Sequence, residues 1–223
     1  MDFKIENGPV FTTLRITMSG GEQFRAEAGA MLSMTPTIEL EAKTSGKGLF
    51  GAVKAAVGGE SFFASLFTAR SEGELVLAPS TLGDIIHLKM SGFTLNAQGG
   101  AYLAGSPSLE LSTKGSLKSL ISGEGLFLQT ISGSGDLFLN SYGAIYQKTL
   151  NPGERYIVDT GHIVAWEHSV SYQIRKAARG LFSTLASGEG LVCEYTGPGK
   201  IWMQTRNLPA FVNMIGRLLP KGK

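Results

Sequence analysis

A repeated pattern is the feature that most constrains the fold of this 223-residue chain. Residues 29–40 and 100–111 match in residue class at nearly every position without a gap, and a looser third copy occupies residues 161–172. Each copy opens on a glycine that is expected to lie in a turn: Gly29, Gly100 and Gly161. One such unit is too small to bury an apolar face alone, so three copies are expected to pack side by side in one domain.

A Gly-Glu step forms a second landmark that recurs about every 65 residues. The three steps are Gly59-Glu60, Gly123-Glu124 and Gly188-Glu189. A charge kept at one place in every repeat suggests a shared geometric task. We favour a salt bridge or a capping contact between neighbouring repeats over the alternative, which is a ring of carboxylates that binds cations or basic partners.

Each repeat is predicted to hold a strand, a turn, a second strand, a short helix and then a hairpin. Alternating apolar and polar residues indicate strands with one buried face; they occupy residues 38–41, 109–112 and 170–173. Glycine-rich bends between short apolar runs predict hairpin turns; they precede residues 74–77, 136–139 and 200–203. The chain is therefore expected to be mainly β, with short helices ahead of the Gly-Glu steps.

The domain prediction is a single domain over residues 1–223, with pseudo-repeats at approximately 1–90, 91–150 and 151–223. The last stretch departs from the repeat, because Asn207 can cap a helix that holds Pro209 near its first turn and ends before Pro220. This helix carries basic residues beside its apolar ones. Packing on the sheet is the favoured role of the apolar stripes on the short helices ahead of the Gly-Glu steps. Docking on a membrane surface or a protein partner is the alternative, and the C-terminal helix is a second candidate for that role.

Composition excludes several classes of protein. The net charge is +2, from 20 basic and 18 acidic side chains, which is too small to imply nucleic acid or an anionic membrane by itself. The single cysteine, Cys193, excludes an intramolecular disulfide framework and suits a reducing compartment. Neither a signal peptide nor an apolar run long enough to span a membrane is apparent, so a cytoplasmic protein is expected.

Three strings of residues carry a resemblance to a known family. They are Val-Asp-Thr-Gly-His-Ile-Val-Ala at 158–165, Gly-Glu-Gly-Leu at 188–191 and Trp-Met-Gln-Thr-Arg at 202–206. On these residues the chain resembles the tryptophan-RNA-binding-attenuator-like (TRAP-like) family of uncharacterised proteins, which includes a yeast protein linked to mitochondrial biogenesis. The resemblance covers essentially the whole chain.

The resemblance implies three tandem TRAP-like β-subdomains of the double-stranded β-helix type, together with short helices and a C-terminal helix. It also implies a homotrimer in which nine subdomains form a pseudo-ninefold ring, and a family without an established enzymatic activity. The tryptophan pocket and the RNA-binding residues of the attenuator are not carried over, because no Lys/Arg pattern repeats in register across the three copies.

Catalytic and metal-binding patterns are weak in this sequence. The histidines are His87, His162 and His168, and none stands two residues from another as a metal-binding double-stranded β-helix would require. Cys193 lies on a predicted strand without a basic neighbour to lower its pKa, so a small core residue is the favoured interpretation. His162 replaces an alanine of the other copies and is a candidate contact with a neighbouring repeat or a partner. We therefore expect no catalytic residue, no metal and no cofactor.

The leading hypothesis from the sequence is a non-enzymatic ring-forming scaffold or binding protein of unknown ligand, and association with membranes is part of this hypothesis. A nucleic-acid-binding regulatory ring, by analogy with the tryptophan attenuator, is the alternative. A metal-dependent small-molecule enzyme is a third and disfavoured reading. The expected partners are copies of the same chain, and a membrane surface or another protein is the next candidate.

Overall fold

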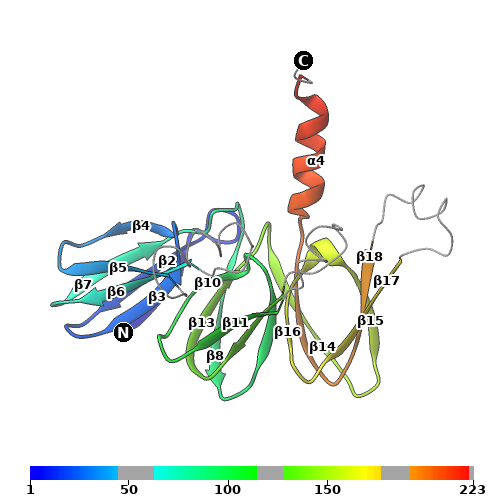
Figure 1. The fold of residues 1–223 in the computed structure, drawn as a ribbon, viewed down its shortest axis with the longest axis horizontal. Coiled ribbons are helices and arrows are strands. Elements are labelled where there is room, and N and C mark those ends of the chain that lie inside the picture. Colours follow the sequence, from blue (N-terminus) through cyan, green and yellow to red (C-terminus); the bar gives the residue numbers. More distant parts are fainter. Residues whose placement is uncertain (45–62, 115–127, 177–190, 221–223) are drawn as a thin grey trace.

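Strands dominate the computed structural model, which describes residues 1–44, 63–114, 128–176 and 191–220 (Figure 1). The first sheet contains, in spatial order, β1 (Asp2–Glu6), β2 (Thr13–Met18), β7 (Gly73–Leu77) and β4 (Met31–Met34). The second contains β5 (Ile38–Thr44), β6 (Phe63–Ala69), β3 (Gln23–Glu27), β10 (Tyr102–Gly105), β13 (Ser134–Asn140) and β8 (Ile85–Ser91).

The other two sheets continue the same arrangement along the chain. The third contains β11 (Glu110–Lys114), β12 (Leu128–Ser132), β9 (Leu95–Gln98), β16 (Ile163–Glu167), β19 (Gly199–Gln204) and β14 (Ile145–Leu150). The fourth contains β15 (Arg155–Asp159), β18 (Leu191–Thr196) and β17 (Ser171–Lys176). A short 3₁₀ turn, η1 (Thr160–His162), precedes β16, and the helix α4 (Leu208–Leu218) follows β19. The protein is therefore mainly β, with several open sheets and one C-terminal helix in the described residues.

Strand pairing repeats three times along the chain. We call β2–β7 repeat 1, β8–β13 repeat 2 and β14–β19 repeat 3. In each repeat the first, sixth and third strands lie side by side in one sheet, and the second, fifth and fourth lie side by side in another. Except for the fourth and fifth strands, which pair with each other, consecutive strands of a repeat lie in different sheets.

The hairpin predicted after each Gly-Glu step was wrong. β6 pairs with β3 and β5, whereas β7 pairs with β2 and β4, so the bend between them carries the chain from one sheet to another. At this crossing the backbone passes close to a neighbouring loop. A Cβ atom on Gly73 would lie 2.5 Å from the hydroxyl oxygens of Thr35 and Thr37, which is why glycine is needed there. Glycine and flanking apolar residues mark a bend, but they do not tell a hairpin from a crossing.

Neighbouring repeats are joined by strand pairing. β3 of repeat 1 pairs with β10 of repeat 2, with Ala26 opposite Ala104, and β9 of repeat 2 pairs with β16 of repeat 3, with Ala97 opposite Ala165. Each six-stranded sheet is thus half of one repeat and half of the next. The small alanine side chains at both junctions let the two halves approach in the same way.

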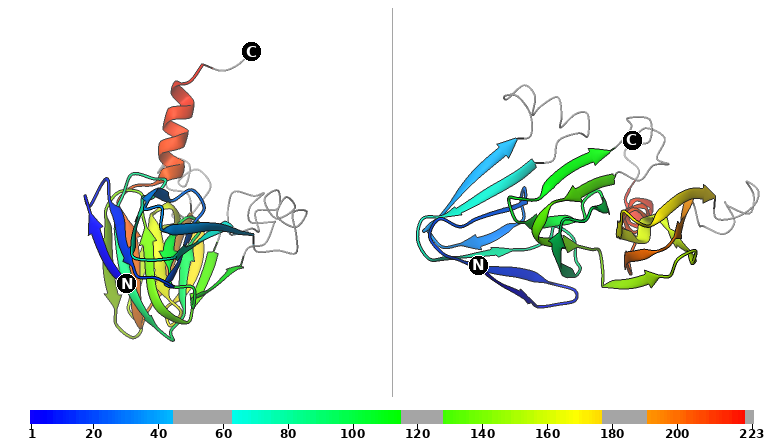
Figure 2. Two further views of the ribbon diagram at one scale, coloured as in Figure 1. Left: turned by 90° about the vertical axis from the view of Figure 1, so that its left-hand side faces the viewer. Right: turned by 90° about the horizontal axis from the view of Figure 1, so that it is seen from below.

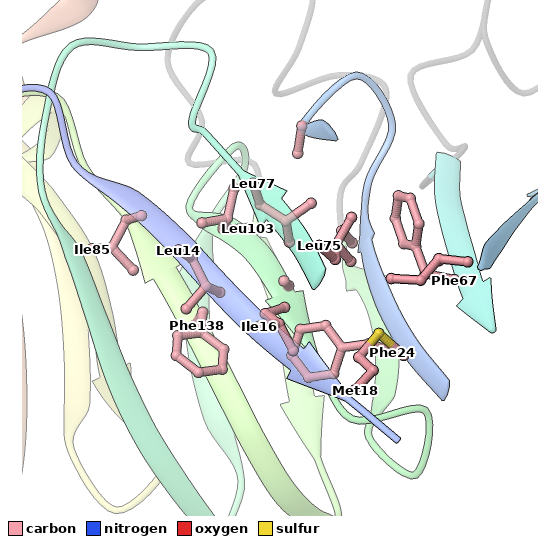
Figure 3. Close-up of a cluster of buried hydrophobic side chains, with 14 of the residues drawn as sticks. Leu14, Ile16, Met18, Phe24, Phe67, Leu75, Leu77, Ile85, Leu103 and Phe138 are labelled. Atoms are coloured by element: carbon pink, nitrogen blue, oxygen red, sulfur yellow. The ribbon is translucent and has the colours of Figure 1, made fainter. Parts of the chain in front are cut away.

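The apolar cores also cross the repeat boundaries. The first core cluster combines Leu14 and Phe24 of repeat 1 with Ile85, Leu103 and Phe138 of repeat 2 (Figure 3). The second cluster combines residues of repeat 2 with Val164, Ala165 and Trp202 of repeat 3. The third cluster draws its described residues from repeat 3 and from one partly buried leucine at its margin, Leu128. The next repeat therefore completes the core of the first two repeats, and no following repeat is present to do so for the third.

The helix α4 projects away from the sheets (Figures 1 and 2). It begins as predicted: the Asn207 side chain accepts a hydrogen bond from the backbone N–H of Ala210, and Pro209 occupies the first turn. None of its residues is buried. In the described part of the chain, no helix has both the length and the apolar character that a membrane crossing requires.

The residue Phe138 tests the shared core. Its ring is fully buried, and the centroid of this ring lies 5.1 Å from that of Phe3 and 6.0 Å from that of Phe24. Replacing Phe138 with alanine leaves a cavity between two repeats and is expected to lower the free energy of unfolding by about 3–5 kcal/mol. Urea denaturation followed by circular dichroism measures this loss. Leu82→Ala, at a site 58% exposed, serves as the control and is expected to change stability by less than about 0.5 kcal/mol.

Candidate functional site

Two strand edges break the repeated pairing. The strands β10 and β16 each pair with the preceding repeat, but their counterpart β4 is the edge of the first sheet. The strands β3 and β9 each pair with the following repeat, but their counterpart β15 is the edge of the fourth sheet. These two edges lie toward opposite ends of the row of repeats (Figure 1). They are complementary halves of the junction that occurs twice inside the chain.

The edge at β4 exposes apolar side chains that its counterparts bury. Leu32 is 59% exposed, whereas Leu103 at the same place in β10 is 0% exposed and Val164 in β16 is 1% exposed. Met31, the residue before Leu32, is also exposed, although its counterparts are buried. Exposed apolar residues on an unpaired strand edge favour pairing with another chain. The residue type at β4 thus fits a covered edge rather than a free one.

The edge at β15 has the same character. Ile157 is 51% exposed. Its counterparts in the internal junctions are Arg25, which pairs with Gly105, and Asn96, which pairs with Trp166. An exposed isoleucine at an unpaired strand edge again fits a covered position better than a solvated one.

A cavity of about 300 Å³ opens where the three repeats meet the base of α4. The side chains of Asn140 and Gln204 organise its rim: Asn140 donates to the carbonyl oxygens of Gly100 and Ala101 at 3.1 and 3.3 Å, and Gln204 donates to that of Gly161 at 3.0 Å. These two amides fix the turns that lead into β10 and β16. The remaining lining includes Glu27, Gln98, Tyr142 and Leu208.

Glu27 supplies the one carboxylate among the described residues that line this cavity. Burial raises the pKa of the Glu27 carboxyl from its ordinary value of 4.5 to about 7. The counterparts of Glu27, two residues before the repeat glycine, are Gln98 in repeat 2 and Asp159 in repeat 3. Asp159 accepts a hydrogen bond of 2.8 Å from the backbone N–H of Gly161, so its carboxylate caps the turn η1.

The chemistry open to this cavity is binding and proton exchange. Its described lining contains no histidine, no cysteine and no second carboxylate. A carboxyl group that titrates near neutrality can donate or accept a hydrogen bond, and the backbone and amide groups around it can hold a small polar molecule. The described lining offers serine hydroxyls but no histidine to activate one of them as a nucleophile, and a single carboxylate is too few ligands for a metal ion.

His162 contacts its own repeat. Its ring nitrogen Nδ1 lies 2.8 Å from the backbone oxygen of Gln204 in the adjacent strand β19. The preceding residue, Gly161, lies so close to Asn207 that a Cβ atom would overlap the Asn207 side chain. Asn207 in turn caps α4 and donates to Asp159 at 3.3 Å. The structure therefore places the third repeat glycine under the start of α4.

The other two repeat glycines have a different physical role. Gly29 and Gly100 have φ angles of +86° and +84°, in the left-handed region that side chains with a Cβ atom rarely adopt. The same position in the sequence pattern is thus required for a turn in two repeats and for a close approach in the third.

Other candidate residues do not gather into a site. His87 lies 2.8 Å from Asp136, and its ring stacks on the ring of Phe138 with 4.7 Å between the centroids. Cys193 is fully buried, and burial raises the pKa of its thiol, which opposes the formation of a reactive thiolate. Within the described ranges, no cluster of three or more His, Cys, Asp or Glu side chains could hold a metal ion. The landmarks Gly59, Glu60, Gly123, Glu124, Gly188 and Glu189, and the predicted short helices ahead of them, lie outside the described residues.

Sequence reasoning missed the two most informative residues, Leu32 and Glu27. The sequence pattern could have pointed to Leu32, because this position is apolar in all three repeats. The structure then shows that in repeat 1 the position lies on an open edge. The signal for Glu27 was weaker, since the position holds Glu, Gln and Asp in the three repeats. Only the fold shows that Glu27 and Gln98 line the same cavity and that Glu27 supplies its carboxylate.

Comparison with known proteins gives matches over the length of the chain. A family model described as "Mitochondrial biogenesis AIM24" matches residues 3–206. An uncharacterised protein of Streptococcus pyogenes serotype M6 is 33% identical over 229 residues, which cover 99% of this chain and 92% of that protein. A crystal structure of a Streptococcus pyogenes protein is similar with a TM-score of 0.81 and 32% identity, and it covers 98% of this chain and 99% of its own.

The raised pKa of Glu27 predicts a pH dependence of stability. Between pH 4.5 and about 7 the folded state holds a proton on Glu27 that the unfolded state has lost, so this contribution to stability falls as the pH rises through that window. The Glu27→Gln variant has no carboxylate to bury in its charged form, so it is expected to be more stable than the wild type at pH 8. Its free energy of unfolding is also expected to change less with pH.

Denaturation at pH 5 and pH 8 checks the direction of this effect. The exposed Glu72 provides the matched control, because Glu72→Gln removes the same charge from a surface site and is expected to leave the profile unchanged. Equal profiles for the wild type and Glu27→Gln would contradict the assignment.

Proposed function

The chain belongs to the mitochondrial biogenesis AIM24 family, and from its two open edges we propose that it is a non-enzymatic scaffold subunit whose copies join head to tail in a ring. The observation that carries this proposal is the pairing of β3 with β10 and of β9 with β16, which leaves β4 and β15 as the two unmatched halves of the same junction. A third junction of this kind would lie between two chains.

The internal junctions define the register of the proposed contact. Ala26 lies opposite Ala104 and Ala97 lies opposite Ala165. At the corresponding positions, Val158 of one chain would lie opposite Ser33 of the next, and Ile157 would lie opposite Met34. All four side chains are small or apolar, so the pairing brings no buried charge into the junction.

Burial supplies the driving force for this contact. Leu32, Met31 and Ile157 are all partly or largely exposed in the single chain. Burying such a side chain fully contributes about 1.5–3 kcal/mol. Leu32 would enter the third core cluster in the way that Leu103 enters the first and Val164 enters the second. The third core would then be completed by a following repeat, as the other two are.

A head-to-tail contact generates either a closed ring or an open filament, depending on the rotation between subunits. We favour a closed ring of three chains, in which each six-stranded repeat is one TRAP-like subdomain of the double-stranded β-helix type and nine repeats follow one another. Closure pairs every β4 with a β15 and leaves neither edge open to aggregation.

The charge distribution supports a scaffold over a nucleic-acid-binding ring. Basic side chains on the strands form ion pairs with carboxylates, as Arg15 does with Glu6 and Glu74, Lys89 with Asp136, and Arg155 and Arg175 with Glu194. The Arg25 guanidinium instead donates to the backbone oxygens of Pro107 and Leu109. Cations that are committed to partners within the fold do not form a track for phosphates.

The mass of the protein in solution tests the ring. Wild-type protein at micromolar concentration is expected to sediment at three times the 23.7 kDa of one chain. The Leu32→Glu variant places a carboxylate in the junction and is expected to weaken the assembly by about a thousandfold or more, because a buried unpaired charge costs several kcal/mol. This variant should sediment as a single chain with unchanged circular dichroism.

The matched control is Leu82→Glu, which places the same charge at a leucine of nearly equal exposure, 58%, away from both edges. It is expected to keep the trimeric mass. A wild-type protein that remains a single chain at micromolar concentration would refute the ring, and so would a trimer that Leu32→Glu and Leu82→Glu affect equally.

A further inference from the structure

The helix α4 presents an apolar face that the sheets do not cover. Its exposed large apolar residues recur at helical spacing along one side: Leu208, Phe211, Val212, Met214, Ile215, Leu218 and the C-cap residue Leu219. Exposure is greatest at the end farthest from the sheets, where Leu218 is 76% exposed. An amphipathic helix in a folded protein normally buries such a face against the rest of the chain, so an exposed face of this kind favours contact with a partner outside the chain.

The base of the helix is fixed, and the rest is free of the sheets. The Asn207 side chain donates a hydrogen bond to Asp159, the residue that caps η1. The centroid of the Phe211 ring lies 5.9 Å from that of the Tyr142 ring. Beyond this first turn the helix extends away from the sheets, as Figure 1 and the left-hand view of Figure 2 show. The anchoring therefore directs the apolar face into the space on one side of the row of repeats (Figure 1).

The charge around the helix is of one sign. The polar side of α4 holds Asn213 and Arg217, and residues 207–223 contain three basic and no acidic side chains. A helix with an apolar face and a cationic flank matches the boundary between anionic headgroups and acyl chains. A coiled coil with sister helices or a groove on a protein would need no such bias in charge.

On these grounds we propose that α4 docks on an anionic lipid surface, with its apolar face in the headgroup region and Arg217 beside the lipid phosphates. The proposal goes beyond the ring and rests on it only for the affinity of lipid binding. In a trimer the three helices would leave the same face and bind one bilayer together. Such multivalency raises the affinity well above that of a single short helix. A single chain would bind through the same contacts more weakly.

The test uses the purified full chain and sedimentation with vesicles of phosphatidylcholine, with and without phosphatidylglycerol. The wild type is expected to bind the anionic vesicles, to bind the neutral ones weakly and to dissociate as salt rises. Met214→Glu and Asn213→Glu form a matched pair, because they add the same charge to neighbouring positions, one on the apolar face and the other on the polar face of the helix. Met214→Glu is expected to reduce the partition coefficient about tenfold or more relative to Asn213→Glu.

Three results would overturn the proposal. The first is a wild-type protein that does not bind anionic vesicles, and the second is equal binding by the variants at Met214 and Asn213. The third is a Met214→Glu variant that loses the oligomeric mass, which would mean that the face covers a second copy. Leu32→Glu separates this proposal from the ring. If this variant still binds anionic vesicles and the added substitution Met214→Glu reduces that binding, the lipid contact is supported whether or not the mass measurement supports the trimer.

Discussion

The structure depends on strand pairing between repeats. A six-stranded repeat divides its strands between two sheets, and neither half forms a complete core by itself. The pairs β3–β10 and β9–β16 bring the next repeat against this open side, and its apolar residues, such as Leu103 and Phe138, then fill the core of the preceding repeat. Each repeat is therefore stabilised by its neighbour, and the array is a chain of nearest-neighbour contacts.

This constraint determines what happens at the two ends. The first repeat retains a strand edge that has no preceding repeat to pair with, and the third retains a core that has no following repeat to complete it. The exposed Leu32 and Ile157 lie at these places. The same interaction that holds the chain together thus supplies the physical basis for the proposed assembly. The helix α4 is independent of it, because only its first turn contacts the repeats.

Residue patterns predicted some parts of the site and not others. Asn207 and Pro209 predicted the start of α4 correctly, because a capping side chain and a first-turn proline act on adjacent backbone groups. The glycines at 29 and 100 predicted turns for the same local reason. The bend at Gly73 was misread as a hairpin, since the strands on either side choose their partners from distant parts of the chain. Glu27 could not be identified, because its environment comes from three repeats.

By itself the sequence determined the triplication, the predominance of strands and the amphipathic C-terminal helix, all of which follow from local periodicity and capping. Only the tertiary structure decided which strands pair, that each core is shared between repeats, and which counterpart positions are left exposed. Alternation of apolar and polar residues predicts which face of a strand is buried, but it does not predict which strand lies next to it. The identity of that neighbour distinguishes Leu32 at an open edge from Leu103 in a closed core, although the two residues occupy the same place in the repeat.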